Sequence, residues 1–185
     1  MIFRAVEDAD LIREARRGDV EAYNLLISRW EKRVYNYLLR IVADREEALD
    51  LSQDVFLKAY QNLRKLEDPA RFAPWLFRIA HNEAFSSFRK RRPESDSLSE
   101  PDMADELPAR TGTFPLELSI AVTTALARLS DEHREAVILK IYQGFKFEEI
   151  AEILSCPVST VKSRLYTALD LLKDTLTSVE MRGKG

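Results

Sequence analysis

Apolar residues recur at helical spacing along most of this chain, and no segment shows the alternation typical of a half-buried strand. The pattern predicts a helical region over residues 10–41, broken near Gly18 and Asp19, and a long helix over 45–65. A third helix is predicted from Pro74, which suits a first helical turn, to about Arg91. The apolar residues of the first two regions are Leu11, Ala15, Leu26, Trp30, Val34, Leu38 and Ile41, then Ala48, Leu51, Val55, Ala59 and Leu63.

Residues 93–115 interrupt this helical pattern. Few large apolar residues remain there to be buried, and Arg110 is the only cation among many carboxylates. Such a composition is typical of a linker. Its prolines are Pro93, Pro101, Pro108 and Pro115, and its acids are Glu94, Asp96, Glu100, Asp102, Asp105 and Glu106.

Helical spacing resumes beyond residue 115. Ser130 is a residue type that caps helix N-termini and Gly144 a type that ends helices, so a helix is predicted between them. This helix and the one before it carry apolar residues at Leu118, Val122, Leu126 and Leu129, then at Val137, Ile138 and Ile141. We therefore expect an all-α protein of two small helical domains, residues 1–92 and 116–185, joined by the acidic linker 93–115.

Residues 147–172 have the pattern of a helix-turn-helix. Residues 155–157, Ser-Cys-Pro, break the first helix, and Ser159 is the expected N-cap of the second. In such a motif the N-terminal end of the second helix enters the major groove, where hydroxyls and cations contact phosphates and base edges. The residues predicted to pack inward are Val161, Leu165, Ala168, Leu169 and Leu172. Those left facing outward are Ser159, Thr160, Lys162, Ser163, Arg164, Tyr166 and Thr167. The alternative is an ordinary antiparallel helix pair with a solvated face.

The net charge of −3 is unexpected for a DNA-binding protein, which usually carries a basic surface. Either the chain does not bind DNA, or a partner supplies much of the affinity. The single cysteine, Cys156, excludes an intramolecular disulfide, and a buried structural thiol is the favoured reading over a redox site. No metal cluster, nucleophile motif or phosphate loop can be identified, so we expect neither an enzyme nor a bound cofactor. With no membrane span and no signal peptide, a cytoplasmic location is expected.

Cations gather in residues 71–92, with Glu83 as the only acid. On a helix from Pro74, Trp75, Arg78, Asn82, Phe85 and Arg89 share one side. A mixture of cations, an amide and aromatic rings suits a strand with unstacked bases. The alternative places both rings in the core and leaves residues 89–92 as a solvated helix end.

The helix over 45–65 offers a second surface. Asp50, Asp54, Leu57 and Gln61 align on one face, beside Gln53, Phe56 and Tyr60. An exposed leucine and aromatic rings among carboxylates suit a protein partner. Periodicity alone favours a solvated outer face.

Three segments resemble motifs of the extracytoplasmic-function (group 4) sigma factors of the bacterial sigma-70 family. Residues 44–60, DREEALDLSQDVFLKAY, are similar to region 2.2 of that family. Residues 72–82, FAPWLFRIAHN, are similar to the signature that leads into region 2.4. Residues 150–165, IAEILSCPVSTVKSRL, are similar to the region 4 helix-turn-helix. The motifs occur in the family's order, and the resemblance covers about residues 8–176.

The resemblance implies a factor that binds core RNA polymerase, directs it to promoters and helps to open the DNA. Region 2.2 would dock on the β′ clamp helices through Asp50, Gln53, Asp54, Phe56, Leu57 and Tyr60. The minus-ten element would be recognised, and a flipped base held, by Arg71, Phe72, Trp75, Arg78, Asn82, Arg89 and Lys90. Region 4 would dock on the β flap and read the minus-thirty-five element through Ser159, Thr160, Lys162, Ser163, Arg164, Tyr166 and Thr167. Polymerase would then supply the non-specific affinity, and an anti-sigma factor is the expected regulator.

Four positions depart from the family pattern. Ser86 replaces a frequent acid, Ser155 and Ser159 replace frequent glycines, and Thr167 replaces a frequent arginine. A positive φ at Ser155 would cost about 1 kcal/mol relative to glycine. Two alternatives remain open: a sigma-like decoy that titrates an anti-sigma factor, and a helix-turn-helix regulator that acts without polymerase.

Overall fold

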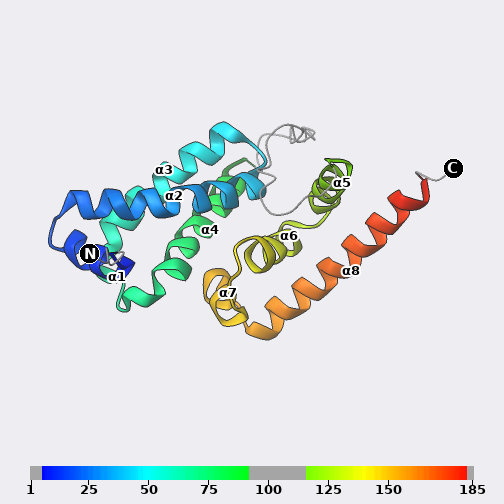
Figure 1. Ribbon diagram of the computed structural model, residues 1–185. Coiled ribbons are helices and arrows are strands. Elements are labelled where there is room, and N and C mark those ends of the chain that lie inside the picture. The colour runs from blue at the N-terminus through cyan, green and yellow to red at the C-terminus, as the bar shows by residue number, and fades with distance from the viewer. Residues whose placement is uncertain (1–5, 92–115, 183–185) are drawn as a thin grey trace, which may run out of the picture. The chain divides into compact units, whose positions relative to one another are not determined.

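The computed structural model describes residues 6–91 and 116–182, and all the regular structure in these two ranges is helical (Figure 1). The predicted all-α class is confirmed. The chain divides into two compact units, with the sequence boundary between Asp96 and Ser97, and each unit is described by itself. Residues 93–115, for which the sequence predicts a linker, lie outside the described residues. Within the described ranges, no helix has the length and apolarity that a membrane span requires.

The first unit contains four α-helices and two short 3₁₀ turns: α1 (Asp8–Arg16), α2 (Val20–Val42), α3 (Arg45–Asn62), η1 (Leu63–Lys65), η2 (Pro69–Arg71) and α4 (Phe72–Arg91). The predicted break near Gly18 is confirmed, because Gly18 has a φ of 101° that few other residues adopt. Asp19 and Asp44 cap α2 and α3 by accepting hydrogen bonds from the backbone N–H groups of Ala22 and Glu47. Helix α4 begins at Phe72, two residues before the predicted start.

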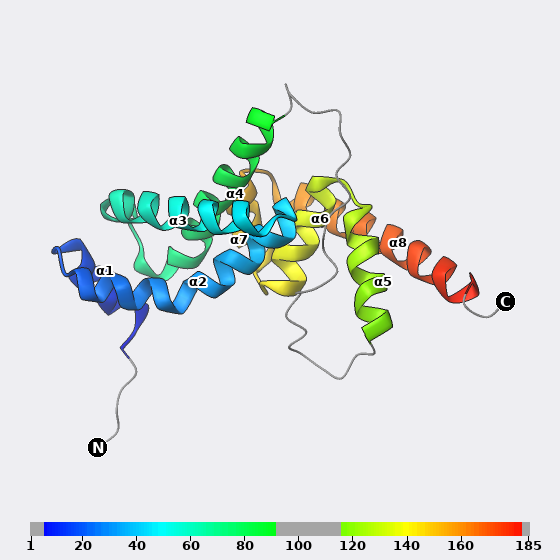
Figure 2. The same ribbon diagram turned by 90° about the horizontal axis from the view of Figure 1, so that it is seen from above.

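Helix α2 is the central element of the first unit, in contact with α1, α3 and α4. Figures 1 and 2 both show α2 and α3 side by side. Aromatic rings fill the core between α2 and α4, because Tyr37 of α2 and Phe77 of α4 are fully buried and their centroids lie 5.2 Å apart in an edge-to-face arrangement. Two contacts tie α4 to α3: the ammonium of Lys58 lies 2.5 Å from the Glu83 carboxylate, and the Ser87 hydroxyl donates to Glu47.

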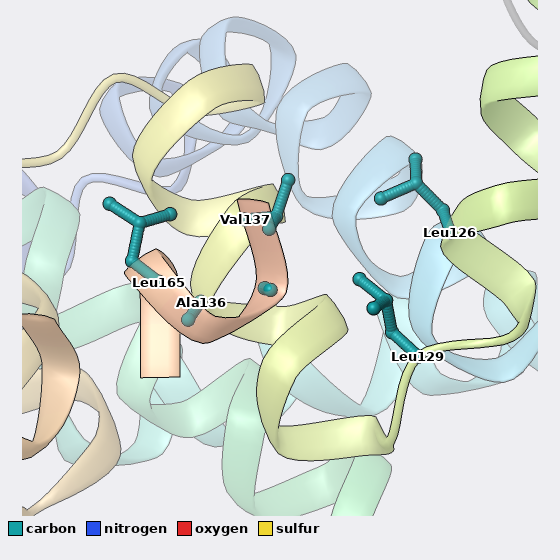
Figure 3. Close-up of a cluster of buried hydrophobic side chains, with 6 residues drawn as sticks. Leu126, Leu129, Ala136, Val137 and Leu165 are labelled. Atoms are coloured by element: carbon teal, nitrogen blue, oxygen red, sulfur yellow. The ribbon is translucent and has the colours of Figure 1, made fainter. Parts of the chain in front are cut away.

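The second unit contains α5 (Leu116–Ala127), α6 (Asp131–Val137), a π-helical turn η3 (Ile138–Tyr142), α7 (Phe147–Leu154) and α8 (Val158–Arg182). The predicted cap at Ser130 is confirmed, since its hydroxyl accepts from the backbone N–H of His133. Small and branched aliphatic side chains form the core. Figure 3 shows this cluster, which consists of Leu126, Leu129, Ala136, Val137, Leu165 and Ala168.

Three local expectations for the second unit are wrong. The carbonyl of Pro157 accepts the N–H groups of Thr160 and Val161, so Pro157 is the N-cap of α8 and Ser159 lies inside its first turn. Leu169 is 39% exposed, because it is about 100° around the helix from the buried Ala168. The helix after Ser130 does not stay α-helical to Gly144, since the Gln143 N–H bonds to the carbonyl of Ile138, five residues earlier.

Candidate functional site

The first candidate surface is the side of α4 that carries polar residues. Arg78, Asn82, Arg89 and Lys90 are all exposed, and Trp75 is half-buried beside them. Arg71, just before the helix, is also exposed. The structure therefore leaves most of the predicted minus-ten residues accessible on or next to one helix.

Phe72 is the exception in this set, because it is only 3% exposed. Its ring centroid lies 5.9 Å from that of Trp30 on α2 and 5.9 Å from that of Trp75. Such packing supports Trp75 and leaves Phe72 no face for a base. Further along α4, the Phe85 ring packs 4.6 Å from that of His81.

Sequence periodicity did not single out Arg33 of α2. Its guanidinium lies 4.7 Å from the centroid of Trp30 and 5.7 Å from that of Phe77. Burial lowers the pKa of Arg33. Trp30 lies one turn from Arg33 on the same helix, whereas only the fold brings Phe77 of α4 close to this cation.

A groove of about 820 Å³ lies between α2 and α3. Its exposed apolar lining includes Leu49, Leu57 and Tyr60, which are 53%, 56% and 43% exposed. Of the predicted docking residues, Asp50, Gln53 and Asp54 are exposed on the same helix, whereas Phe56 is buried in the groove wall. The polar lining includes Glu31, Lys32 and Gln53, and an apolar groove with such a polar margin has the character of a protein-binding site.

The wall of the groove is fixed by Tyr23 of α2. Its hydroxyl donates to the carbonyl of Phe56 over 2.5 Å, and its ring lies 4.9 Å from that of Tyr60. Burial raises the pKa of Tyr23, so the hydroxyl remains a donor at neutral pH. A buried hydrogen bond thus joins the two helices that form the groove.

The second candidate surface is the N-terminal half of α8. Ser159, Lys162, Ser163, Tyr166 and Thr167 are exposed, as the sequence predicts. Tyr166 presents the largest of these side chains, at 58% exposed. Hydroxyls, an ammonium and a phenol are therefore displayed together on a helix end.

Arg164 and Thr160 are less accessible than the other predicted residues of α8. The guanidinium of Arg164 lies 2.9 Å from the Glu132 carboxylate of α6, and its side chain is only 23% exposed. This pair braces α8 against α6. The Lys162 ammonium remains exposed and lies 5.4 Å from the Phe147 ring centroid.

The turn before α8 contains a strained residue, at the position where Ser155 replaces a frequent glycine of the resembled family. Ser155 has a φ of 51°, in the left-handed region that favours glycine. Burial raises the pKa of the Cys156 thiol, so the thiol is protonated at neutral pH. Cys156 is only partly buried, however, whereas the sequence analysis favours a buried thiol.

Both units match models of known families. The model of Sigma-70 region 2 matches residues 26–94, and the model of Sigma-70, region 4 matches residues 119–172. The ECF RNA polymerase sigma-E factor of Haemophilus influenzae is 30% identical over 91% of this chain and 95% of its own length. The RNA polymerase sigma-H factor of Pseudomonas aeruginosa is 29% identical over 92% of this chain and 94% of its own.

Solved structures agree with this relationship. The sigma factor RpoE in complex with the anti-sigma factor NepR from Bartonella quintana superposes with a TM-score of 0.72, 30% identity, and coverage of 84% of this chain and 96% of that one. CnrH in complex with the cytosolic domain of CnrY gives a TM-score of 0.70, 25% identity, and coverage of 92% and 97%. The chain belongs to the extracytoplasmic-function RNA polymerase sigma factors of the sigma-70 family.

Proposed function

We propose that this sigma factor binds core RNA polymerase in the cytoplasm, directs it to promoters with two upstream elements, and promotes opening of the DNA. One observation carries the proposal. The same chain presents two polar surfaces of different character, one backed by aromatic rings on α4 and one on the helix-turn-helix end of α8. A factor that reads duplex DNA at one element and unpaired bases at another needs both kinds of surface.

The groove between α2 and α3 is the proposed docking site for the β′ clamp helices. Leu57 and Tyr60 supply apolar contact area and Gln53 a polar group within the groove, and Asp50 and Asp54 are exposed on the same helix outside the lining. Phe56 shapes the wall of the groove. Binding to polymerase also accounts for the net negative charge, because the polymerase then supplies most of the attraction to phosphate.

The loop before α4 and the exposed side of α4 are proposed to hold the minus-ten element. Asn82 can donate to and accept from a base edge, Trp75 offers part of a ring for stacking, and the cations at 71, 78, 89 and 90 attract the strand. Extracting one base costs a few kcal/mol, and stacking it on an aromatic ring returns about 1–3 kcal/mol. Binding of the extruded base therefore shifts the equilibrium towards the open DNA without enzyme chemistry.

The N-terminal half of α8 is proposed to enter the major groove of the minus-thirty-five element. Lys162, Ser163, Tyr166 and Thr167 are the proposed contacts to bases and phosphates, with Ser159 near the backbone. Arg164 contributes mainly by bracing α8 through Glu132. The second unit is also the proposed partner of the β flap.

An anti-sigma factor is the proposed regulator. The similar sigma factor RpoE has been solved in complex with the anti-sigma factor NepR, and the similar protein CnrH in complex with the cytosolic domain of CnrY. A partner that covers the α2–α3 groove would exclude polymerase by competition for one surface. The protein would then act only when released.

Run-off transcription tests the proposal. Purified core polymerase, with and without the chain, is given a pool of genomic promoter fragments, and transcript starts are sequenced. We expect discrete starts that share two upstream elements and that Asn82→Ala and Lys162→Ala reduce. Lys173→Ala, on an exposed site farther along α8, is the matched control. Binding to polymerase without any discrete start would favour a decoy that titrates an anti-sigma factor.

A further inference from the structure

The loop between α3 and α4 is held by a residue that is distant in sequence, Arg16. This residue ends α1, and its Nε donates to the carbonyl of Leu63 over 3.1 Å. Its Nη2 donates to the carbonyl of Leu66. One guanidinium thus bridges two carbonyls that lie 47 and 50 residues away in the chain.

These two carbonyls lie where α3 and η1 end. Leu63 is the C-cap of α3, and Leu66 is the C-cap of η1. The last carbonyls of a helix lack partners within it and carry partial negative charge, so a cation placed there is stabilising. The planar fork of arginine can donate to both carbonyls at once, whereas a lysine ammonium has no such fixed geometry.

Arg16 acts at the point where the loop starts. Leu63 and Leu66 are buried, at 2% and 5% exposed, and the chain then turns outward at Glu67 and Asp68. Asp68 caps η2 by accepting from the Ala70 N–H, which fixes the step into α4. The direction of the exposed segment 67–71 is therefore set by the anchored carbonyls behind it.

The same helix also supports the far end of the loop. Asp8, the first residue of α1, accepts from the indole Nε1 of Trp30 over 2.8 Å and pairs with Arg29 over 2.7 Å. Trp30 packs against Phe72, the first residue of α4. Helix α1 therefore contacts the start of the loop through Arg16 and supports its end through Trp30.

We propose that Arg16 is a positioning residue that sets the register of loop 66–71 and so determines the base preference at the minus-ten element. The proposal rests on the proposed function of the loop. Arg16 itself is not proposed to touch nucleic acid. It acts by holding the carbonyls from which the loop departs.

The test measures base preference at both promoter elements in one experiment. Holoenzyme is assembled from core polymerase and full-length Arg16→Gln, Arg16→Lys, Arg17→Ala or the unaltered chain, and transcribes a library randomised at both elements. For Arg16→Gln, the ratio between the best and worst bases at the minus-ten positions is expected to fall about tenfold. Preference at the minus-thirty-five element is expected to stay unchanged. Arg17 is the control, because its guanidinium is exposed and pairs only locally with Glu14 in the described contacts.

A second readout does not depend on transcription. Hydrogen exchange of the backbone amides of residues 66–71 is expected to be faster in Arg16→Gln than in Arg17→Ala, and intermediate in Arg16→Lys. Equal loss of yield at every promoter, with both base preferences intact, would overturn the inference, since that result indicates a merely structural residue. Absence of discrete starts with the unaltered chain would instead overturn the proposed function, and the inference with it.

Discussion

The two surfaces proposed to read DNA differ in what supports their polar side chains. Behind α4 lies a layer of rings and a cation, in which Trp30 contacts Phe72, Arg33 lies over Trp30, and Phe72 contacts Trp75. Behind α8 lies a small aliphatic cluster with Ala136, Val137 and Leu165. The first surface follows an irregular loop, and the second is the regular end of a helix.

This difference matches the different demands of the two tasks. An unpaired base has to be held on a π-face and in a fixed position, so its reader needs rings and an anchored loop. Duplex DNA already presents its base edges in order, so its reader needs only a helix end at the right angle. The minus-ten surface therefore depends on long-range contacts in the first unit, and the minus-thirty-five surface depends on local helix packing.

The largest expected effect comes from breaking the ring-filled core of the first unit. Phe77→Ala removes a fully buried ring that packs against Tyr37. The cavity is expected to lower the free energy of unfolding of that unit by about 3–5 kcal/mol. Urea unfolding followed by tryptophan fluorescence measures the loss, because Trp30 and Trp75 both report on this unit. A change below about 1 kcal/mol would contradict the assigned core.

The next effect concerns the α2–α3 groove. Both DNA-reading surfaces would depend on it, because it is the proposed docking site for polymerase. Leu57→Asp places a charge on the apolar lining and is expected to weaken binding to core polymerase by about 2 kcal/mol. Binding to both promoter elements should weaken together, whereas a substitution on one DNA-reading surface should weaken binding to one element only. Leu25→Asp is the control, since Leu25 is a similarly exposed leucine of α2 outside the groove lining. Equal affinities of the two variants for polymerase would argue against the groove as the docking site.

A smaller effect is expected on the duplex-reading surface. Lys162→Ala should weaken binding of the holoenzyme to the minus-thirty-five duplex by about 1 kcal/mol. It should also make the slope of log affinity against log salt concentration shallower by about one, since one fewer counterion is released. Titrations of fluorescent duplex at several salt concentrations give both values. Lys173→Ala, on the same helix, should leave both unchanged. An unaltered salt slope in Lys162→Ala would remove this residue from the proposed phosphate contacts.

The smallest effect is a stabilising one in the helix-turn-helix. Ser155 has a positive φ, and glycine adopts this conformation without the steric cost of a Cβ. Ser155→Gly is expected to raise the free energy of unfolding of the second unit by about 0.5–1 kcal/mol. Thermal unfolding by circular dichroism measures the shift. A lower melting temperature would mean that the serine side chain makes a compensating contact.

Local features of the fold could be predicted from the sequence. The break at Gly18, the cap at Ser130 and the long helices follow from residue type and spacing, which act over a few residues. The π-turn at 138–142 could not be predicted, because an α-helix and a π-turn share nearly the same apolar spacing over five residues. The sequence analysis assigned the N-cap of α8 to Ser159 because serine is a frequent N-cap residue. The carbonyl of Pro157 instead accepts the first backbone hydrogen bonds of the helix.

The candidate sites were predicted in part. Exposed residues such as Asn82 and Lys162 were found from helix faces and motif resemblance. The burial of Phe72 was missed, because it depends on Trp30, which lies 42 positions earlier in the printed sequence. Arg16 was missed for the same reason, since its partners lie 47 and 50 residues away. Contacts at such separations leave no local pattern in a single sequence.

Permanganate probing of unpaired thymines in promoter complexes distinguishes DNA opening by α4 from duplex reading by α8. Holoenzymes with the unaltered chain, Asn82→Ala and Lys162→Ala are compared on one promoter, and reactivity is divided by the fraction of DNA bound. We expect Asn82→Ala to lower the reactivity at the minus-ten element per bound complex, and Lys162→Ala to lower the bound fraction with normal reactivity per complex. Equal reactivity per bound complex for all three proteins would contradict the assignment of opening to α4 and of duplex reading to α8.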